Sequence, residues 1–221
     1  MSEQSAPAAA ANGAIEAVWR LESTRLIAAL VRIVRDVGMA EDLAQDALVA
    51  ALAQWPTEGI PNNPAAWLMT AAKRRAIDQF RQGERRDRGY TAIARDQAGE
   101  VIVPDFTAAL DHVEDDVLRL MFVCCHPSLT TDTRTTLTLK LVGGLTTREI
   151  ARSFLSTEAT IAQRVVRAKR TLADARAALE EPDAAERRER LAAVLVVVYL
   201  LFNEGYSATA GADWMRPELC E

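Results

Sequence analysis

Helical periodicity is the feature that most constrains the fold of this chain. Apolar residues recur every three or four positions along nearly all of the sequence, whereas apolar and polar residues alternate nowhere for more than a few positions. In residues 15–36, for example, Leu26, Leu30 and Ile33 fall on one face of a helix. A spacing near 3.6 residues is typical of amphipathic helices and a spacing of two is typical of strands. We therefore predict an all-α fold.

Caps and helix-breaking residues give the expected boundaries. Gly38 closes a first helix over residues 15–36, Pro56 ends a second over 40–55, and Asn63 caps a third over 65–81 with Pro64 at its first position. Further helices are expected over 113–125, 132–142 and 147–154, followed by a helix that Thr157 caps. Residues 1–13, which are alanine-rich and polar, are expected to form a disordered tail.

The composition changes between residues 89 and 111. This segment shows little helical periodicity, is acidic, and contains the helix-breaking residues Gly99 and Pro104. Such a stretch is typical of a linker. The chain of 221 residues, 49% of them hydrophobic, is long enough for one medium domain or two small ones. We predict two small helical domains over 14–88 and 112–180, a linker over 89–111, and the start of a helical C-terminal extension over 181–221.

The longest apolar run, from Leu191 to Phe202, is shorter than the roughly 20 residues that cross a bilayer. It predicts a buried helix or a partner-facing one, and an unpartnered helix of this kind would favour oligomerisation. The N-terminus lacks the basic and apolar regions of a signal peptide, and three cysteines do not form a disulfide framework. We expect a cytoplasmic protein with no membrane contact.

The charge of the chain is unevenly distributed. The net charge is −5, yet residues 67–88 carry +4 and residues 158–172 carry +3, which leaves −12 on the remainder. A basic helix favours contact with phosphate, while the acidic remainder is repelled by it. The two basic segments therefore predict local nucleic-acid surfaces on an otherwise acidic protein.

The second basic segment has the pattern of a helix-turn-helix. A short helix over 147–154 follows the Gly143–Gly144 bend, and "LST" makes the turn. In the next helix Ile161, Val165, Ala168 and Leu172 share the face expected to pack inward. The outward positions are Thr160, Gln163, Arg164, Arg167 and Arg170. Since glutamine and arginine make bidentate contacts with base edges, this helix is predicted to read a major groove, although a solvated helix pair in a bundle is the simpler alternative.

The first basic segment adds an aromatic residue to its cations. "NNPAAWLMTAAKRRAIDQFRQGERR" places Trp67 at a capped helix start, and its charges taken alone fit a solvated face equally well. Just upstream, "AEDLAQDALVAALAQW" sets Asp42, Gln45, Asp46 and Val49 on one helix face. That face is either simply solvated or a docking surface for a basic partner.

These three segments, in this order and with this linker, resemble a bacterial RNA polymerase sigma factor of the extracytoplasmic-function (ECF) type. The resemblance covers about residues 18–175 and implies a subunit that binds core RNA polymerase and brings it to promoter DNA. "LRLMFVCCHPSLT" and "VVVYLLFNEGYSA" resemble the subgroup in which a helical-repeat extension follows the second domain. The resemblance implies regulation by the fused domain, and this sequence departs from the subgroup pattern in that it stops at Glu221, where a helix is expected to begin.

The resemblance also suggests roles for individual residues. It implies that the acidic face docks on the clamp helices of the largest polymerase subunit, and we assign to this contact Asp42, Gln45, Asp46 and Val49. The loop over 57–63 resembles one that holds a flipped base of the −10 element, and the residues assigned to that element are Asn62, Asn63, Trp67, Lys73, Arg74, Arg75 and Arg81. Those assigned to the −35 element are Arg148, Thr160, Gln163, Arg164, Val166, Arg167, Lys169 and Arg170, with Arg164, Lys169 and Arg170 best placed for phosphates.

No catalytic constellation competes with this interpretation. The chain has two histidines and no phosphate-cradling glycine loop, so we expect neither an enzyme nor a cofactor. A metal or thiol sensor at Cys124, Cys125 and His126 stays a second hypothesis, with buried thiols favoured. The alternative function is a helix-turn-helix regulator that binds duplex DNA without polymerase. The charge distribution predicts weak promoter binding by the protein alone.

Overall fold

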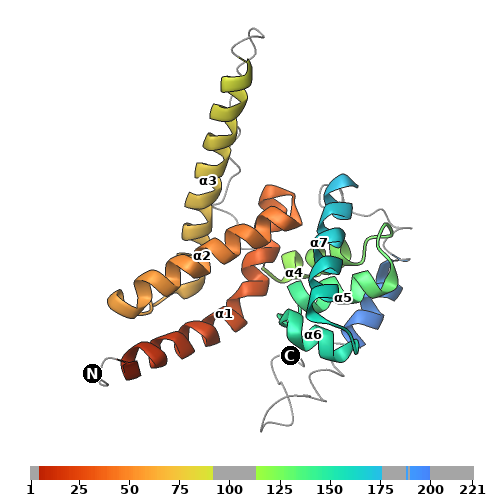
Figure 1. The fold of residues 1–221 in the computed structure, drawn as a ribbon, viewed down its shortest axis with the longest axis horizontal. Helices are drawn as coiled ribbons and strands as arrows, with labels where there is room; N and C mark the ends of the chain where they lie inside the picture. Colours follow the sequence, from red (N-terminus) through yellow and green to blue (C-terminus); the bar gives the residue numbers. More distant parts are fainter. Residues whose placement is uncertain (1–4, 92–112, 176–187, 189, 200–221) are drawn as a thin grey trace.

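A computed structural model describes residues 5–91, 113–175, 188 and 190–199 of the chain, and these residues form helices joined by short turns (Figure 1). The all-α prediction is confirmed. In the N-terminal half lie α1 (Ser5–Val34), α2 (Val37–Glu58) and α3 (Pro64–Thr91). In the C-terminal half lie α4 (Val113–Cys124), α5 (Thr131–Leu141), α6 (Thr147–Ser153) and α7 (Glu158–Asp174). Residues 190–199 are also helical.

α1 begins earlier than expected. Helix is described from Ser5 onward, so residues 5–13 are not a disordered tail, and the prediction was wrong for them. The segment contains five alanines between Ala6 and Ala11, and alanine has the highest helix propensity of any residue. Residues 1–4 lie outside the described residues.

The break between α1 and α2 falls at Arg35 and Asp36, and not at Gly38. Arg35 has a φ of 56°, which ends α1. Asp36 is extended, and its Oδ1 accepts a hydrogen bond from the Met39 N–H at 2.6 Å, which caps α2. Gly38 therefore lies in the first turn of α2. A short polar side chain at the N-cap fixes this boundary more strongly than the flexible glycine that follows it.

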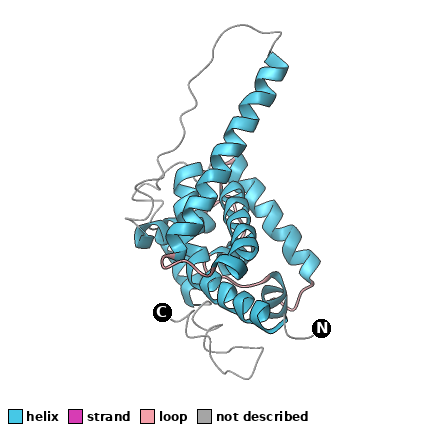
Figure 2. Ribbon diagram, turned by 90° about the vertical axis from the view of Figure 1, so that its left-hand side faces the viewer, coloured by secondary structure: helices cyan, strands magenta, loops and turns pink. Residues whose placement is uncertain are grey.

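Two helices extend beyond their predicted ends. α2 passes through Pro56 and ends at Gly59, whose φ of 85° suits glycine and whose N–H donates to the Trp55 carbonyl at 2.9 Å. Proline costs one backbone hydrogen bond, which the last turn of a helix tolerates. α3 continues to Thr91 through a run that contains three arginines, and arginine is a good helix former. It extends away from the rest of the molecule in both views (Figure 2).

The two halves share one hydrophobic core. α1 packs on α2, on α3 and also on α4, while α2 packs on α7. Leu30 and Leu43 from the N-terminal half and Leu120 and Leu137 from the C-terminal half belong to the same cluster of buried side chains. A second cluster joins α6 and α7 to residues 190–199 through Ile150, Ile161, Val194 and Val197, which puts the beginning of the predicted extension against the helix-turn-helix. The linker predicted over 89–111 lies almost wholly outside the described residues.

Candidate nucleic-acid and polymerase interface

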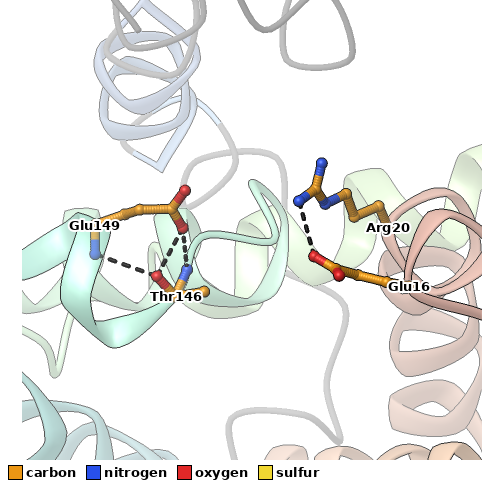
Figure 3. A network of polar contacts seen from close by, with 4 residues as sticks. All are labelled: Glu16, Arg20, Thr146 and Glu149. Atoms are coloured by element: carbon orange, nitrogen blue, oxygen red, sulfur yellow. Dashed lines mark hydrogen bonds and ion pairs between the residues drawn. The ribbon is translucent and has the colours of Figure 1, made fainter. Parts of the chain in front are cut away.

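Reciprocal hydrogen bonds fix the start of the helix-turn-helix at α6. The Thr146 backbone N–H donates to Glu149 Oε2 at 2.7 Å, and the Glu149 N–H donates back to Thr146 Oγ1 at 3.2 Å (Figure 3). This capping box satisfies two N–H groups that the first turn would otherwise leave unpaired. The turn then passes through Leu155, which has a φ of 49° and is almost fully exposed. The motif therefore starts and turns where the sequence indicated.

α7 has one buried face and one exposed face. The predicted N-cap is confirmed, since Thr157 Oγ1 accepts a hydrogen bond from the Thr160 N–H at 3.2 Å. The buried residues are Ile161, Val165, Ala168 and Leu172, as predicted. The exposed residues among those assigned to the −35 element are Arg148, Thr160, Gln163, Val166, Arg167 and Arg170. α7 thus presents amide, guanidinium and apolar groups on the surface opposite its buried face.

Two further residues assigned to the −35 element interact within the protein. The Arg164 guanidinium donates to Thr136 Oγ1 at 3.2 Å and lies over the Phe154 ring, 5.3 Å from its centroid. Lys169 forms an ion pair with Glu41 of α2, and its side chain is 20% exposed. Arg164 and Lys169 therefore have protein partners already, whereas Arg167 and Arg170 are exposed and have no ion pair among the residues that the structure describes.

Glu41 is a residue that sequence reasoning missed. It is 5% exposed, and it also accepts a hydrogen bond from Gln45 Nε2 at 3.1 Å. A buried glutamate requires a cationic partner, since an unpaired charge in the interior is strongly unfavourable. One signal was available, because Glu41 follows Val37 by four residues and so lies on the apolar stripe of α2.

The acidic face of α2 adjoins the basic face of α3. Asp42, Gln45 and Val49 are exposed, as a docking face requires. Asp46 is half-buried and pairs with Arg75 of α3, Arg75 Nε lying 2.9 Å from Asp46 Oδ2. The structure therefore brings one residue assigned to polymerase and one assigned to the −10 element into direct contact.

A groove of about 540 Å³ runs between α2 and α3. Trp67, Thr70 and Arg74 line its α3 side, and Val49 lies on its α2 side. The Trp67 ring packs edge-on against the buried Trp55, with centroids 5.2 Å apart and planes at 68°. Of the other residues assigned to the −10 element, Lys73 is half-buried, whereas Arg74, Arg75 and Arg81 are exposed. An anchored aromatic ring beside arginines is suited to stacking and phosphate contact.

Asn62 and Asn63 lie in the exposed loop before α3. The predicted cap is confirmed, because Asn63 Oδ1 accepts a hydrogen bond from the Ala66 N–H at 3.0 Å. The oxygen of the Asn63 side chain is therefore used by the cap, while the Asn62 side chain is exposed.

The two adjacent cysteines are buried, as expected. Burial raises the pKa of the Cys124 thiol and that of the Cys125 thiol, so both stay protonated at neutral pH. Within the described residues, no cluster of three or more histidine, cysteine, aspartate or glutamate side chains has the arrangement of a metal site. Among the described helices, none is long and apolar enough to span a membrane.

This arrangement defines a helical protein with a helix-turn-helix and two separate charged surfaces, and comparison with known proteins places it in a family. Residues 19–86 match the family described as sigma-70 region 2, residues 119–172 match sigma-70 region 4, and residues 190–221 match a family of unknown function, DUF6596. No solved structure matches the chain significantly.

Curated relatives agree with these matches. The chain is 32% identical over 156 residues to the ECF RNA polymerase sigma factor SigK of Mycobacterium ulcerans (strain Agy99), covering 67% of this chain and 78% of that protein. It is 30% identical to SigK of Mycobacterium tuberculosis (strain ATCC 25618 / H37Rv), with the same coverage. It is 41% identical over 198 residues to uncharacterized protein R00370 of Rhizobium meliloti (strain 1021), covering 87% of this chain but 46% of that protein.

The chain belongs to the ECF sigma factors of the sigma-70 family. It spans somewhat less than half the length of R00370, and its match to DUF6596 fits the predicted C-terminal extension.

Proposed function

We propose that this protein binds core RNA polymerase through α2, directs it to promoters through α3 and α7, and assists DNA opening. The proposal rests on two kinds of surface in one protein: an exposed acidic and amide face on α2, and exposed arginines on both α3 and α7. A regulator that only binds duplex DNA does not need the acidic and amide face of α2.

The α7 surface supports recognition of duplex DNA. Gln163 and Arg167 are exposed on the side away from the buried Ile161 and Val165. Arg167 can donate two hydrogen bonds to a guanine edge, and Gln163 can donate one to adenine and accept one from it. The N-terminal half of α7 is the part of a recognition helix that enters the major groove. Val166, 65% exposed beside them, can contact a thymine methyl group.

The α3 surface supports contact with an opened strand. Trp67 offers an aromatic surface at the groove, and Arg74 extends the same lining with a positive charge. Stacking on an aromatic ring is largely independent of base identity, so sequence preference at the −10 element would come from the loop containing Asn62 and Asn63. The polymerase supplies the chemistry of transcription, and the proposal therefore places the protein in the cytoplasm with its partners.

Transcription in vitro tests this proposal. The template is the DNA upstream of the protein's own gene, and purified core polymerase is used with and without the protein. We expect a transcript only when the protein is present, and its loss in the variant Asp42→Ala/Gln45→Ala. Glu16→Gln is the matched control, because Glu16 is exposed on α1 and its ion pair with Arg20, at 2.9 Å, lies at the surface (Figure 3).

The outcomes are distinct. A transcript that the α2 variant leaves unchanged would refute docking through this face. No transcript from an active core, together with tight binding of the protein alone to the same duplex, would favour a helix-turn-helix regulator that acts without polymerase.

A further inference from the structure

An ion pair joins the acidic face of α2 to the basic face of α3 at the groove between them. Arg75 Nε lies 2.9 Å from Asp46 Oδ2, and both residues line the groove together with Trp67 and Arg74. The sequence assigned Asp46 to the polymerase contact and Arg75 to the −10 element. Asp46 therefore lies where two predicted surfaces meet, and its carboxylate is already paired with a cation of the same chain.

The packing of α2 on α3 brings these two side chains together. Asp46 precedes Ala47 in α2, and Arg75 precedes Ala76 in α3. Both alanines are buried, and small side chains at a contact allow two helix axes to approach closely. A short aspartate side chain can then reach the guanidinium of the facing helix. The ion pair is thus held between two helices that pack through a buried core.

The ion pair affects the orientation of Arg75 more than the stability of the fold. The Arg75 side chain is 59% exposed and that of Asp46 is 36% exposed, and ion pairs this exposed contribute little to folding. A guanidinium is planar, however, so a contact at Nε also limits where its terminal nitrogens can point. Those terminal nitrogens make no ion pair within the described part of the chain, so their N–H groups are available to a phosphate.

Asp42, one helical turn before Asp46, provides a direct contrast. It is exposed, and its carboxylate has no ion pair among the residues that the structure describes. A basic partner that docks on α2 can contact Asp42 directly, whereas it must displace Arg75 to reach Asp46. The two carboxylates of the same face are therefore suited to different roles.

We propose that Asp46 is a positioning residue of the −10 surface and not a docking contact for polymerase. It holds Arg75 so that the terminal nitrogens of the guanidinium meet a phosphate of the opened strand. This inference rests on the proposed function of α3. The phosphate would belong to the nucleotide whose base stacks on Trp67, or to its neighbour, because Trp67 and Arg75 line the same groove.

Two effects of Asp46 on strand binding have opposite signs. Its negative charge repels phosphate, so removal of the charge alone should tighten binding. Its ion pair orders the Arg75 side chain before the strand arrives, so less conformational entropy is lost on binding. Ordering one such side chain accounts for about a twofold to tenfold change in affinity. The proposal requires the ordering effect to exceed the repulsion.

The test uses the full 221-residue protein and a fluorescein-labelled single strand of about 12 deoxythymidines. Fluorescence anisotropy at low salt gives the affinity for this strand without polymerase. We expect Asp46→Ala to bind about twofold to tenfold more weakly than the wild type. Asp42→Ala removes the same charge from the same face and is the matched control, and it should bind slightly more tightly. Asp46→Glu keeps the charge and can reach Arg75, so it should recover most of the affinity.

A double-mutant cycle shows whether Asp46 acts through Arg75. Arg75→Gln should weaken binding and reduce the slope of log K against log salt by about 0.7, because one phosphate contact is lost. In that background Asp46→Ala should cause no further weakening. Equal weakening in both backgrounds would overturn the proposal, since Asp46 would then act on something other than Arg75. If Asp46→Ala binds as tightly as Asp42→Ala, charge repulsion outweighs orientation and the proposal is likewise overturned.

Affinity for core polymerase separates the positioning role from docking. Asp42→Ala should lower this affinity more than Asp46→Ala does. If Asp46→Ala has the larger effect on polymerase and leaves single-strand binding unchanged, Asp46 is a docking residue and the proposal is wrong. The oligonucleotide measurements need neither polymerase nor a promoter. A failed transcription assay would therefore refute the proposed function, while the cycle alone decides whether Asp46 and Arg75 are coupled in strand binding.

Discussion

Arg164 and Arg167 are both cations of α7, yet the structure predicts opposite consequences when each is replaced by alanine. Arg164 donates a hydrogen bond to Thr136 and covers the Phe154 ring, so Arg164→Ala removes contacts within the folded protein. A hydrogen bond from a charged group contributes about 1.5 kcal/mol and a cation–π contact about 0.5 kcal/mol, less where solvent has access. We expect a loss of about 1–2 kcal/mol in the free energy of unfolding and a fall in Tm of about 4 °C.

Arg167 is exposed, and the expected effects are reversed. Arg167→Ala should leave Tm within about 1 °C of the wild type, since surface substitutions rarely change stability by more than about 0.5 kcal/mol. It should weaken promoter binding by the polymerase complex about tenfold, the effect of losing one contact with a base or phosphate. Thermal unfolding followed by circular dichroism and anisotropy with promoter DNA measure the two quantities. If Arg164→Ala lowers DNA affinity and leaves Tm unchanged, Arg164 contacts phosphate and the inference from its position is wrong.

Three further predictions concern the stability of the C-terminal half. Ile161→Ala, at a fully buried position, should lower the free energy of unfolding by about 3 kcal/mol in urea titration, whereas the exposed Val166→Ala should leave it nearly unchanged. Thr146→Ala removes the capping box and should cost about 1 kcal/mol by the same titration, and Thr146→Ser should restore most of it. Burial raises the pKa of the Cys124 thiol well above its ordinary value, so the unfolded chain loses this proton first as pH rises. Stability should therefore fall above about pH 9, by up to about 1.4 kcal/mol per pH unit, and Cys124→Ala should show a shallower decline; an identical pH profile would contradict the assignment.

Local sequence signals predicted the helix-turn-helix closely. Thr157 caps α7, the row Ile161, Val165 and Leu172 is buried, and Asn63 caps α3. These features depend on residues three or four positions apart, which lie together on any helix whatever surrounds it. The first helix boundary was missed because Asp36, a strong N-cap, lies close to Gly38, and both residue types are compatible with a break.

Contacts between distant parts of the chain could not be predicted in the same way. The partner of Glu41 is Lys169, and the partner of Asp116 is Arg32, which is 84 residues away. Helical periodicity shows that a position faces inward, but it does not identify the element that covers it. For this reason Lys169 and Arg164 were grouped with the DNA-contacting cations, although the folded protein gives each of them a partner.

The difference has a physical consequence for how charge is used in this protein. If α7 binds DNA as proposed, a positive residue that pairs with a carboxylate of the same chain is less available to DNA phosphates, and the acidic remainder of the sequence supplies such carboxylates. Arg167 and Arg170 are exposed, whereas Lys169 is 20% exposed and pairs with Glu41 near the start of α2. The net charge of −5 therefore does not simply repel DNA from the whole molecule. One carboxylate, Glu41 of α2, balances the charge of Lys169, and the cations of α7 therefore differ in what they can offer to an external phosphate.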